Sequence, residues 1–288
     1  MTRLELVRRS DWKERVRRFF DREFVGEAPL PVQCVYWLEV ARRRDLIDRF
    51  VPHAAEAIGI DLGCGTGEYM PQLCRRGYYA VGLDFSPESL RRAKLQLQRF
   101  RFCADFVLCD LEAIPLRNEI GDCLFLVEVI QSLQDKKKLF IEMARISKRV
   151  GRLLLFMPNQ GSIRLELAAA VRRIKIGAGV FFSSNVSVPA SPVTQRELTS
   201  LAGGVGFLVT HEESFWFPPS WLLEALRYPP LIHSAERTIR KFERARVLAE
   251  SLGTQTFMVF QRQARTRTLN SRSSISLSGY PHSTSRAE

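Results

Sequence analysis

The sequence predicts an α/β fold in which a doubly wound sheet is flanked by helices. Three observations predict it: short apolar runs, helical segments between these runs, and a glycine-rich turn after the first run. A chain of 288 residues is long enough to bury a substantial core around such a sheet. We expect the main domain to span residues 54–261, after an N-terminal helical cap over residues 1–53.

The most informative element is the first apolar run with the turn that follows it. Asp61 lies near the end of this run, and glycines then stand at every second position, with one cysteine among them: Gly63, Cys64, Gly65 and Gly67. Glycine reaches positive φ without a steric penalty and lets a ligand lie against bare backbone. The turn therefore predicts a site for a nucleoside-bearing ligand at the carboxyl end of a strand.

The residue after the turn indicates which ligand this is. The dinucleotide pattern G-x-G-x-x-G would place its third glycine where this chain has Glu68. A carboxylate there would repel a diphosphate, so we do not expect NAD to bind. No Gly-Lys-Ser/Thr follows, which also excludes a P-loop. Asp61 and the glycine turn suit instead a cofactor that carries an ammonium group and a ribose.

Further acidic residues stand at the ends of the next apolar runs. Asp84 ends the second run, and its two carboxylate oxygens can accept both hydroxyl groups of a ribose. Asp110 and Glu128 end the third and fourth runs. Four acids at strand ends, in order along the chain, are typical of an open α/β sheet with its ligand at that edge. The predicted strands are 57–62, 80–84, 106–110, 122–129, 152–159, 206–211 and 254–260.

Together these segments resemble class I S-adenosylmethionine (SAM)-dependent methyltransferases. Residues 106–116 resemble the family's G-D-A-E-x-L-P-F pattern, with Cys109 replacing glycine, Leu111 replacing alanine and Ile114 replacing leucine. The resemblance implies a Rossmann-like fold whose sheet has seven strands, the last one antiparallel. It also implies SAM as the cofactor, Phe85 beside the adenine and Asp110 facing its amino group. The cofactor-binding residues that it implies are Asp61, Gly63, Cys64, Gly65, Gly67, Asp84, Phe85, Asp110, Leu111 and Glu128.

The sequence leaves the catalytic residue open. Methyl transfer from a sulfonium releases a neutral thioether, so alignment and exclusion of water can supply much of the acceleration. An oxygen or carbon acceptor also needs a base, for which His211 and His233 are weak candidates. Relatives in ubiquinone-type biosynthesis have Glu-Val-Leu-Glu-His-Leu where this chain has residues 128–133, and Ser132 replaces their histidine. The six cysteines include no C-x-x-C pair, so we expect buried reduced thiols and no metal.

Two insertions enlarge the predicted domain, at about 160–191 and 215–253. Two alternatives remain for their aromatic residues: a satellite core under a long loop, or an apolar pocket for the methyl acceptor. The aromatic residues that would bind the acceptor are Phe181, Phe182, Phe215, Trp216 and Trp221.

Two helices are predicted before the sheet and one between its last strands. Residues 10–20 form an amphipathic pattern, and in the resembling family such a helix often covers the cofactor. A second helix is predicted at 35–50, with its run Arg42, Arg43 and Arg44 facing solvent. Thr194 and Glu197 have the spacing of a capping box, which predicts a helix start before the sixth strand.

The formal net charge of +12 raises the question of nucleic acid. Most of the excess, +7, lies in residues 161–288, which hold 16 basic and 9 acidic groups. Within them, residues 262–288 hold five arginines and one glutamate in a Ser/Thr-rich stretch. We expect a disordered basic tail, which favours solubility and leaves contact with phosphates open.

The expected function is methylation of a small apolar or amphipathic acceptor, such as a lipid, quinone, polyketide or lipid-linked sugar precursor. Peripheral contact with a membrane or lipid stays open. The alternative is an RNA or protein methyltransferase, or a non-catalytic SAM-fold partner. No apolar run approaches the roughly 20 residues of a membrane span, and the N-terminus lacks a signal-peptide core, so we expect a cytoplasmic protein.

Overall fold

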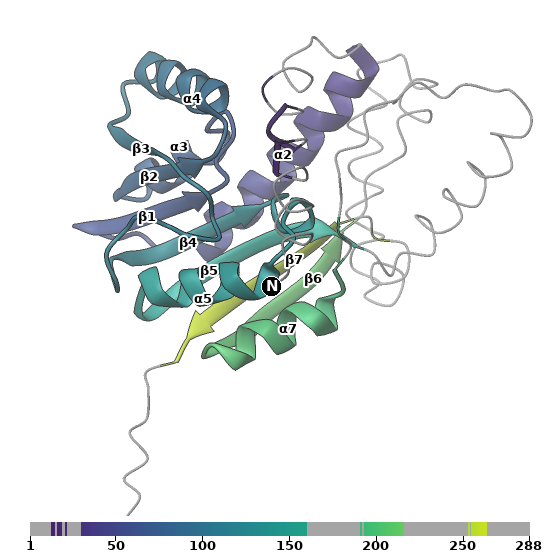
Figure 1. The fold of residues 1–288 in the computed structure, drawn as a ribbon. Helices are drawn as coiled ribbons and strands as arrows, with labels where there is room; N and C mark the ends of the chain where they lie inside the picture. Colours follow the sequence, from purple (N-terminus) through teal and green to yellow (C-terminus); the bar gives the residue numbers. More distant parts are fainter. Residues whose placement is uncertain are drawn as a thin grey trace, which may run out of the picture.

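A computed structural model describes residues 13–14, 16–18, 21, 30–159, 191, 193–215, 253 and 255–263. Its centre is one seven-stranded sheet with the strand order β3-β2-β1-β4-β5-β7-β6 (Figure 1). The strands, in chain order, are β1 (Ala57–Leu62), β2 (Tyr78–Asp84), β3 (Ala104–Leu108), β4 (Gly121–Val127), β5 (Ser147–Pro158), β6 (Phe207–Phe215) and β7 (Gln255–Arg262).

Strand directions confirm the predicted fold class. β1 is parallel to β2 and to β4, β2 is parallel to β3, and β4 is parallel to β5. β7 lies between β5 and β6 and is antiparallel to both. The chain therefore builds outward from β1 to β3 and then crosses to β4, which makes the boundary between β1 and β4 a topological switch point. Ligands of open α/β sheets bind at such points, beyond the carboxyl ends of the strands.

Helices cover both faces of the sheet (Figure 1). Three of them pack on one face with one hydrophobic cluster, namely α2 (Leu30–Phe50), α3 (Met70–Arg75) and α4 (Pro87–Arg99). On the other face lie α5 (Lys136–Ile146) and α7 (Gln195–Gly204), packed in a second cluster. The short 3-10 helix η1 (Ile130–Ser132) follows β4. Strands that are covered on both faces need apolar side chains on both, which explains the apolar runs that the sequence shows at the parallel strands.

Capping side chains fix where α4, α5 and α7 begin, and Asp135 caps α5 by accepting from the amide of Lys138 at 3.1 Å. Ser86 accepts a hydrogen bond from the amide of Ser89 at 3.1 Å, and Pro87 then occupies the first turn of α4. The hydroxyl of Thr194 accepts from the amide of Glu197 at 3.2 Å, so the predicted start of α7 is confirmed. These local bonds satisfy amides that have no partner inside a helix.

Several element boundaries differ from the prediction. α2 begins at Leu30, before the predicted residue 35, and β6 continues to Phe215, past the predicted residue 211. Most of both predicted insertions (160–190 and 216–252) and residues 264–288 of the predicted tail lie outside the described residues.

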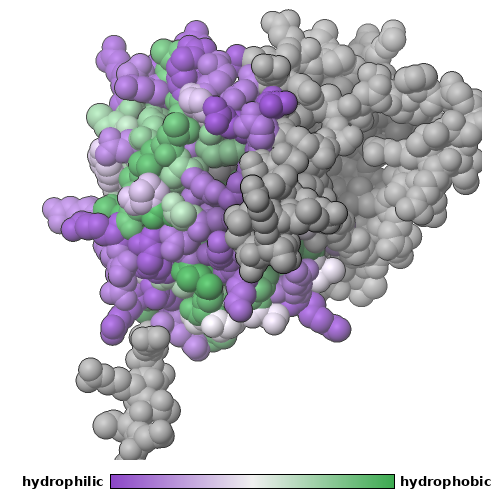
Figure 2. Space-filling view, viewed as in Figure 1, coloured by the Kyte–Doolittle hydropathy of each residue, from purple (hydrophilic) through white to green (hydrophobic). Residues whose placement is uncertain are grey.

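Hydrophilic side chains cover much of the described face in Figure 2, with smaller hydrophobic patches between them. Of the helices described, none is long and apolar enough to cross a membrane.

Candidate active site

A cavity of about 450 Å³ lies at the carboxyl ends of the central strands. Its walls come from the N-terminal segment, α2, the loops after β1, β2, β3 and β4, and the start of β7. This volume lies within the range of small-molecule sites, about 300 to 1,000 Å³. The cavity is therefore where the fold predicts a ligand, at the switch point between β1 and β4.

The glycine turn forms one wall of this cavity. Gly63, Gly65 and Gly67 have φ of 74°, 53° and 82°, a region that side chains other than glycine rarely adopt. The amides of Gly63 and Cys64 donate to one carbonyl of β2, at 2.7 and 2.9 Å. A Cβ atom added at Gly65 would meet nothing within 4 Å, so the backbone there borders open space.

Gly67 has different surroundings from the other two glycines of the turn. It does not line the cavity, and a Cβ atom there would lie 3.1 Å from Leu97 and 3.2 Å from Ala93 of α4. The absence of a side chain at Gly67 therefore lets α4 pack against the turn.

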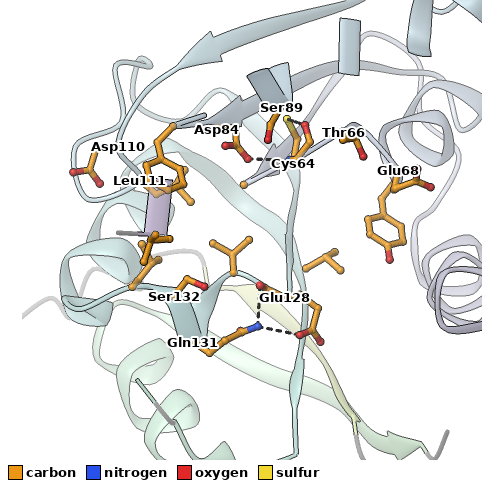
Figure 3. Close-up of a pocket in the computed structure, with 18 of the residues that line it drawn as sticks. Cys64, Thr66, Glu68, Asp84, Ser89, Asp110, Leu111, Glu128, Gln131 and Ser132 are labelled. Carbon is orange, nitrogen blue, oxygen red and sulfur yellow. Dashed lines mark hydrogen bonds between the residues drawn. The ribbon is translucent and has the colours of Figure 1, made fainter. Parts of the chain in front are cut away.

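Asp84 stands at the end of β2 beside the turn (Figure 3). One carboxylate oxygen accepts from the amide of Gly65 and the other from the amide of Ser86, both at 2.9 Å. Burial raises the pKa of Asp84, and these backbone donors oppose the rise. Each carboxylate oxygen retains capacity for a further donor from the cavity.

Asp61 lies behind the cavity wall and does not line it. The residue is 1% exposed, and its Oδ2 atom has no hydrogen-bond partner among the described residues. Burial, and then the charge of Asp84, raise the pKa of Asp61 to about 7. Asp61 is thus a buried acid, and it is close enough to Asp84 for the charge of Asp84 to affect its pKa.

The loop after β3 forms the end of the cavity that contains Asp110 and Leu111 (Figure 3). Lys13 from the N-terminal segment donates to Asp110 and, at 2.9 Å, to Glu112. Val16, which is 4% exposed, lines the same cavity. Residues of the N-terminal segment therefore take part in this site.

Glu128 projects from the end of β4, on the side of the cavity opposite Asp84 (Figure 3). Its backbone has φ of 58°, a conformation that is costly for a residue with a side chain and that concentrates at functional sites. Its Oε1 accepts from Arg43 at 3.1 Å and its Oε2 from Gln131 at 2.9 Å. Burial raises the pKa of Glu128, and the positive charge of Arg43 opposes the rise.

The prediction that the arginine run of α2 faces solvent is wrong. Arg43 is 4% exposed, lines the cavity, and donates to the hydroxyl of Tyr69 at 3.2 Å as well as to Glu128. Arg44 donates to the carboxylate of Glu68 at 2.9 Å, and Arg42 lies 3.5 Å from a carboxylate of β6. Arg43 is thus buried and Arg42 and Arg44 are partly buried, because each of the three lies against an acidic side chain from another part of the chain.

Sequence reasoning missed the residues of α2, the β1–α3 loop, η1 and β7 that line this cavity: Glu39, Arg43, Tyr69, Gln131 and Gln255. One signal was present, because Glu39 and Arg43 are four positions apart and so share a helix face. Burial raises the pKa of Glu39 to about 7. The other residues are brought together only by the fold.

Two predicted site residues lie elsewhere in the described part. His211 is on β6, where its Nε2 lies 3.1 Å from the carboxylate of Glu213 and its ring 4.3 Å from that of Phe50. Phe215 is 1% exposed and packs edge-on against Phe156 in the core. Neither lines the cavity, since His211 lies on the edge strand β6 and the ring of Phe215 packs in the core. Other predicted residues lie outside the described ones: Phe181, Phe182, Trp216, Trp221 and His233.

The described cysteines are free, but they are not uniformly buried as predicted. Cys64 and Cys123 are buried, whereas Cys103, in the loop before β3, is exposed. Within the described ranges, no group of three or more His, Cys, Asp or Glu residues is arranged to hold a metal ion.

Comparison with known proteins gives three findings. The "Methyltransferase domain" family matches residues 60–155. A malonyl-[acyl-carrier protein] O-methyltransferase of Hamiltonella defensa is 30% identical over 115 residues, which are 40% of this chain and 43% of that protein. A ubiquinone biosynthesis O-methyltransferase of Nitrosomonas europaea is 28% identical over 110 residues, 38% of this chain and 47% of that one. The matches thus cover less than half the length of these curated relatives.

Among solved structures, the geranyl diphosphate C-methyltransferase of Streptomyces coelicolor A3(2), in complex with Mg²⁺, geranyl diphosphate and S-adenosyl-L-homocysteine (SAH), is similar with a TM-score of 0.62. It shares 16% identity, and the similarity covers 87% of this chain and 98% of that one, which shows the fold. The matched family, the strand order of the sheet and the glycine turn all indicate the same class of protein. The chain carries a methyltransferase domain of the class I SAM-dependent methyltransferase superfamily, whose cofactor is SAM.

Proposed function

We propose that this protein transfers a methyl group from SAM to a small amphipathic acceptor. The observation that carries the proposal is the cavity between the glycine turn and Glu128, which joins the cofactor edge of the sheet to a polar wall on β4 and β7. The relatives named as methyltransferases of malonyl-[acyl-carrier protein] and of ubiquinone biosynthesis support this class of reaction.

The residues on the β1 and β2 side fit the adenosine part of the cofactor. Bare backbone at Gly65 borders open space, which suits the close approach of a flat ligand. Asp84 would accept the ribose hydroxyls with the lone pairs that its two backbone donors leave free. Phe85 and Leu111 line the cavity beyond it and would flank the adenine, with Asp110 near its amino group.

Arg43 fits the carboxylate at the other end of the cofactor. Its Nε atom is buried and has no hydrogen-bond partner among the described residues, although its other nitrogens hold Tyr69 and Glu128. A buried donor without a partner is costly, and a carboxylate is a strong partner for a guanidinium. We therefore assign to Arg43 the binding of the methionine carboxylate.

SAM supplies an electrophilic methyl group on a sulfonium when it is bound. The leaving thioether is neutral, so the protein has no charge to stabilise on it, and the residues of the site need mainly to hold acceptor and cofactor in line and exclude water. If the acceptor must lose a proton, the described cavity offers the carboxylates of Glu39 and Glu128. The pKa of Glu39, about 7 because of burial, suits proton transfer near neutral pH.

The acceptor is proposed to be amphipathic because two kinds of wall are available to it. The described wall around Glu128 is polar. The sequence of 215–253 supplies rings such as Trp216 and Trp221, which we propose contact the apolar part of the acceptor.

Incubation of cell extracts with the purified protein and methyl-labelled SAM tests this proposal. We expect label in a small-molecule fraction, and none when a cofactor-site variant, Gly65→Val, replaces the wild type. Label in RNA or in protein instead would overturn the acceptor class and support a macromolecular methyltransferase. No binding of SAM or SAH in titration calorimetry would overturn the proposed function itself.

A further inference from the structure

Two glutamines hold Glu128 from different parts of the chain. Gln131, in η1, donates from its Nε2 atom to the Glu128 carboxylate and to the Glu128 carbonyl, both at 2.9 Å (Figure 3). The side chain of Gln255, at the start of β7, makes a hydrogen bond to the same carboxylate. Because an ionised carboxylate only accepts, each amide must turn its NH₂ end toward Glu128.

This orientation leaves the amide oxygens without donors. The Oε1 atoms of Gln131 and Gln255 are buried and have no hydrogen-bond partner among the described residues, and Gln255 as a whole is 8% exposed. The Oε1 atom of Gln134 is in the same state. Buried carbonyl oxygens are nearly always hydrogen-bonded, so three such oxygens on residues of one cavity call for donors from outside the described residues, which a ligand in the cavity can supply.

All three glutamines line the cavity, on the side of β4 and β7. The residues assigned to the adenosine of the cofactor lie on the other side, after β1, β2 and β3. Figure 3 shows this separation, with Gln131, Ser132 and Glu128 across the cavity from Asp84 and Cys64. These three glutamine residues therefore border the part of the cavity that the adenosine would leave open.

We propose that Gln131, Gln134 and Gln255, here called the amide wall, determine acceptor specificity by accepting hydrogen bonds from a hydroxyl or amine group of the methyl acceptor. The inference rests on the proposed function and names the polar group of its acceptor. An acceptor whose polar end has only lone pairs would leave these oxygens unsatisfied and would face the nearby Glu128 carboxylate. The amide wall thus selects donors and rejects anions and ethers.

The test uses the SAH-bound protein and two matched pairs of probes, observed by saturation-transfer NMR. Catechol and 1-hexanol carry hydroxyl donors, whereas 1,2-dimethoxybenzene and 1-methoxyhexane have the same frameworks without them. We expect each alcohol to bind at least about fivefold more tightly than its ether, the scale of one buried unsatisfied group. Gln131→Met and Gln255→Met remove the oxygen and should abolish the preference while SAH affinity stays within about twofold.

Gln72→Met is the matched control. Gln72 is 2% exposed and also has a buried Oε1 without a partner in the described part, but it lies in α3 and does not line the cavity. This variant should keep the wild-type preference. Thermal unfolding of each variant shows whether it is folded, and Gln131→Met, at a less buried position, remains informative if Gln255→Met does not fold.

Three results would overturn this inference but not the proposed function. In the first, the protein binds SAH but shows no preference for the alcohols, or binds neither pair of probes. In the second, the preference survives in both Gln131→Met and Gln255→Met, and in the third, these variants lose more than about tenfold in SAH affinity. The last result would assign the amide oxygens to the ammonium group of the cofactor. Failure of the wild type to bind SAH would overturn the proposed function, and this inference with it.

Discussion

The guanidinium of Arg43 donates to the carboxylate of Glu128 across 3.1 Å and so joins α2 to the end of β4, 85 positions later in the chain. Arg43 is 4% exposed, so its charge is removed from water and depends on the carboxylate of Glu128, whose side chain is 28% exposed. The pair also sets one corner of the cavity, because both residues line it. A contact that stabilises the fold is thus also part of the site.

The Arg43–Glu128 pair should show strong energetic coupling. Arg43→Met leaves the partly buried Glu128 carboxylate without its cation, which should cost up to about 3 kcal/mol of unfolding free energy, the lower end of the range for a fully buried pair. The double variant with Glu128→Gln should cost much less than the sum of the single variants, as measured by urea unfolding at pH 8. The exposed pair Glu14 and Arg18, at 3.0 Å, is the control, with expected coupling of no more than about 1 kcal/mol. Additive single effects at Arg43 and Glu128 would contradict a functional ion pair.

Gly65→Val should eliminate SAM binding and leave the protein folded. The added side chain would enter the open space that the backbone at Gly65 borders, and φ of 53° there would cost valine about 1 to 2 kcal/mol. Gly206→Val controls for this strain, because Gly206 has φ of 87° and equally open surroundings but lies before β6, away from the cavity. Titration calorimetry with SAM and circular dichroism separate the two effects. Normal SAM binding by Gly65→Val would mean that this glycine serves only the turn.

Asp84→Asn should weaken SAM binding by about 1.5 to 3 kcal/mol, the range for a lost hydrogen bond to a charged group. Asparagine is the smaller change, because its one oxygen can still accept from the amide of Gly65 or of Ser86, whereas alanine leaves both amides without an acceptor. Asp105→Asn, at an exposed position of β3, should leave the affinity unchanged. Calorimetric titration of both variants measures the difference, and equal affinities would remove the ribose assignment from Asp84.

Asp61 should make the free protein less stable as the pH rises. Its folded pKa of about 7 lies above the ordinary value of 3.8 because of burial and the nearby Asp84. The favourable contribution of the neutral acid is thus fully present below pH 4 and is lost as the pH rises through 7. Asp61→Asn should stabilise the protein at pH 8, by at most about 4 kcal/mol, and have little effect at pH 4. Thermal unfolding across this range checks the sign; greater stabilisation at low pH would contradict a raised pKa.

Local sequence patterns determined much of the fold. The glycines after β1 adopt positive φ because they lack side chains, and Thr194 caps α7 because its hydroxyl reaches an amide three residues later. Both effects depend on covalent geometry and near neighbours, so the order of residues is enough to predict them. For the same reason the strands and the acidic residues at their ends were predicted within a few positions.

Tertiary packing decided which polar side chains are buried and what they meet. Arg43 was predicted to face solvent with its two neighbours, but it is buried against Glu128. Phe215 was predicted to bind the acceptor, but its side chain is buried in the core. Gln131 and Gln255 meet at one carboxylate only because β7 enters the sheet between β5 and β6. The sequence by itself thus determined the class of fold and the glycine turn. Only the tertiary structure decided the polar wall opposite that turn, because the burial of a charged or amide group depends on partners that distant segments supply.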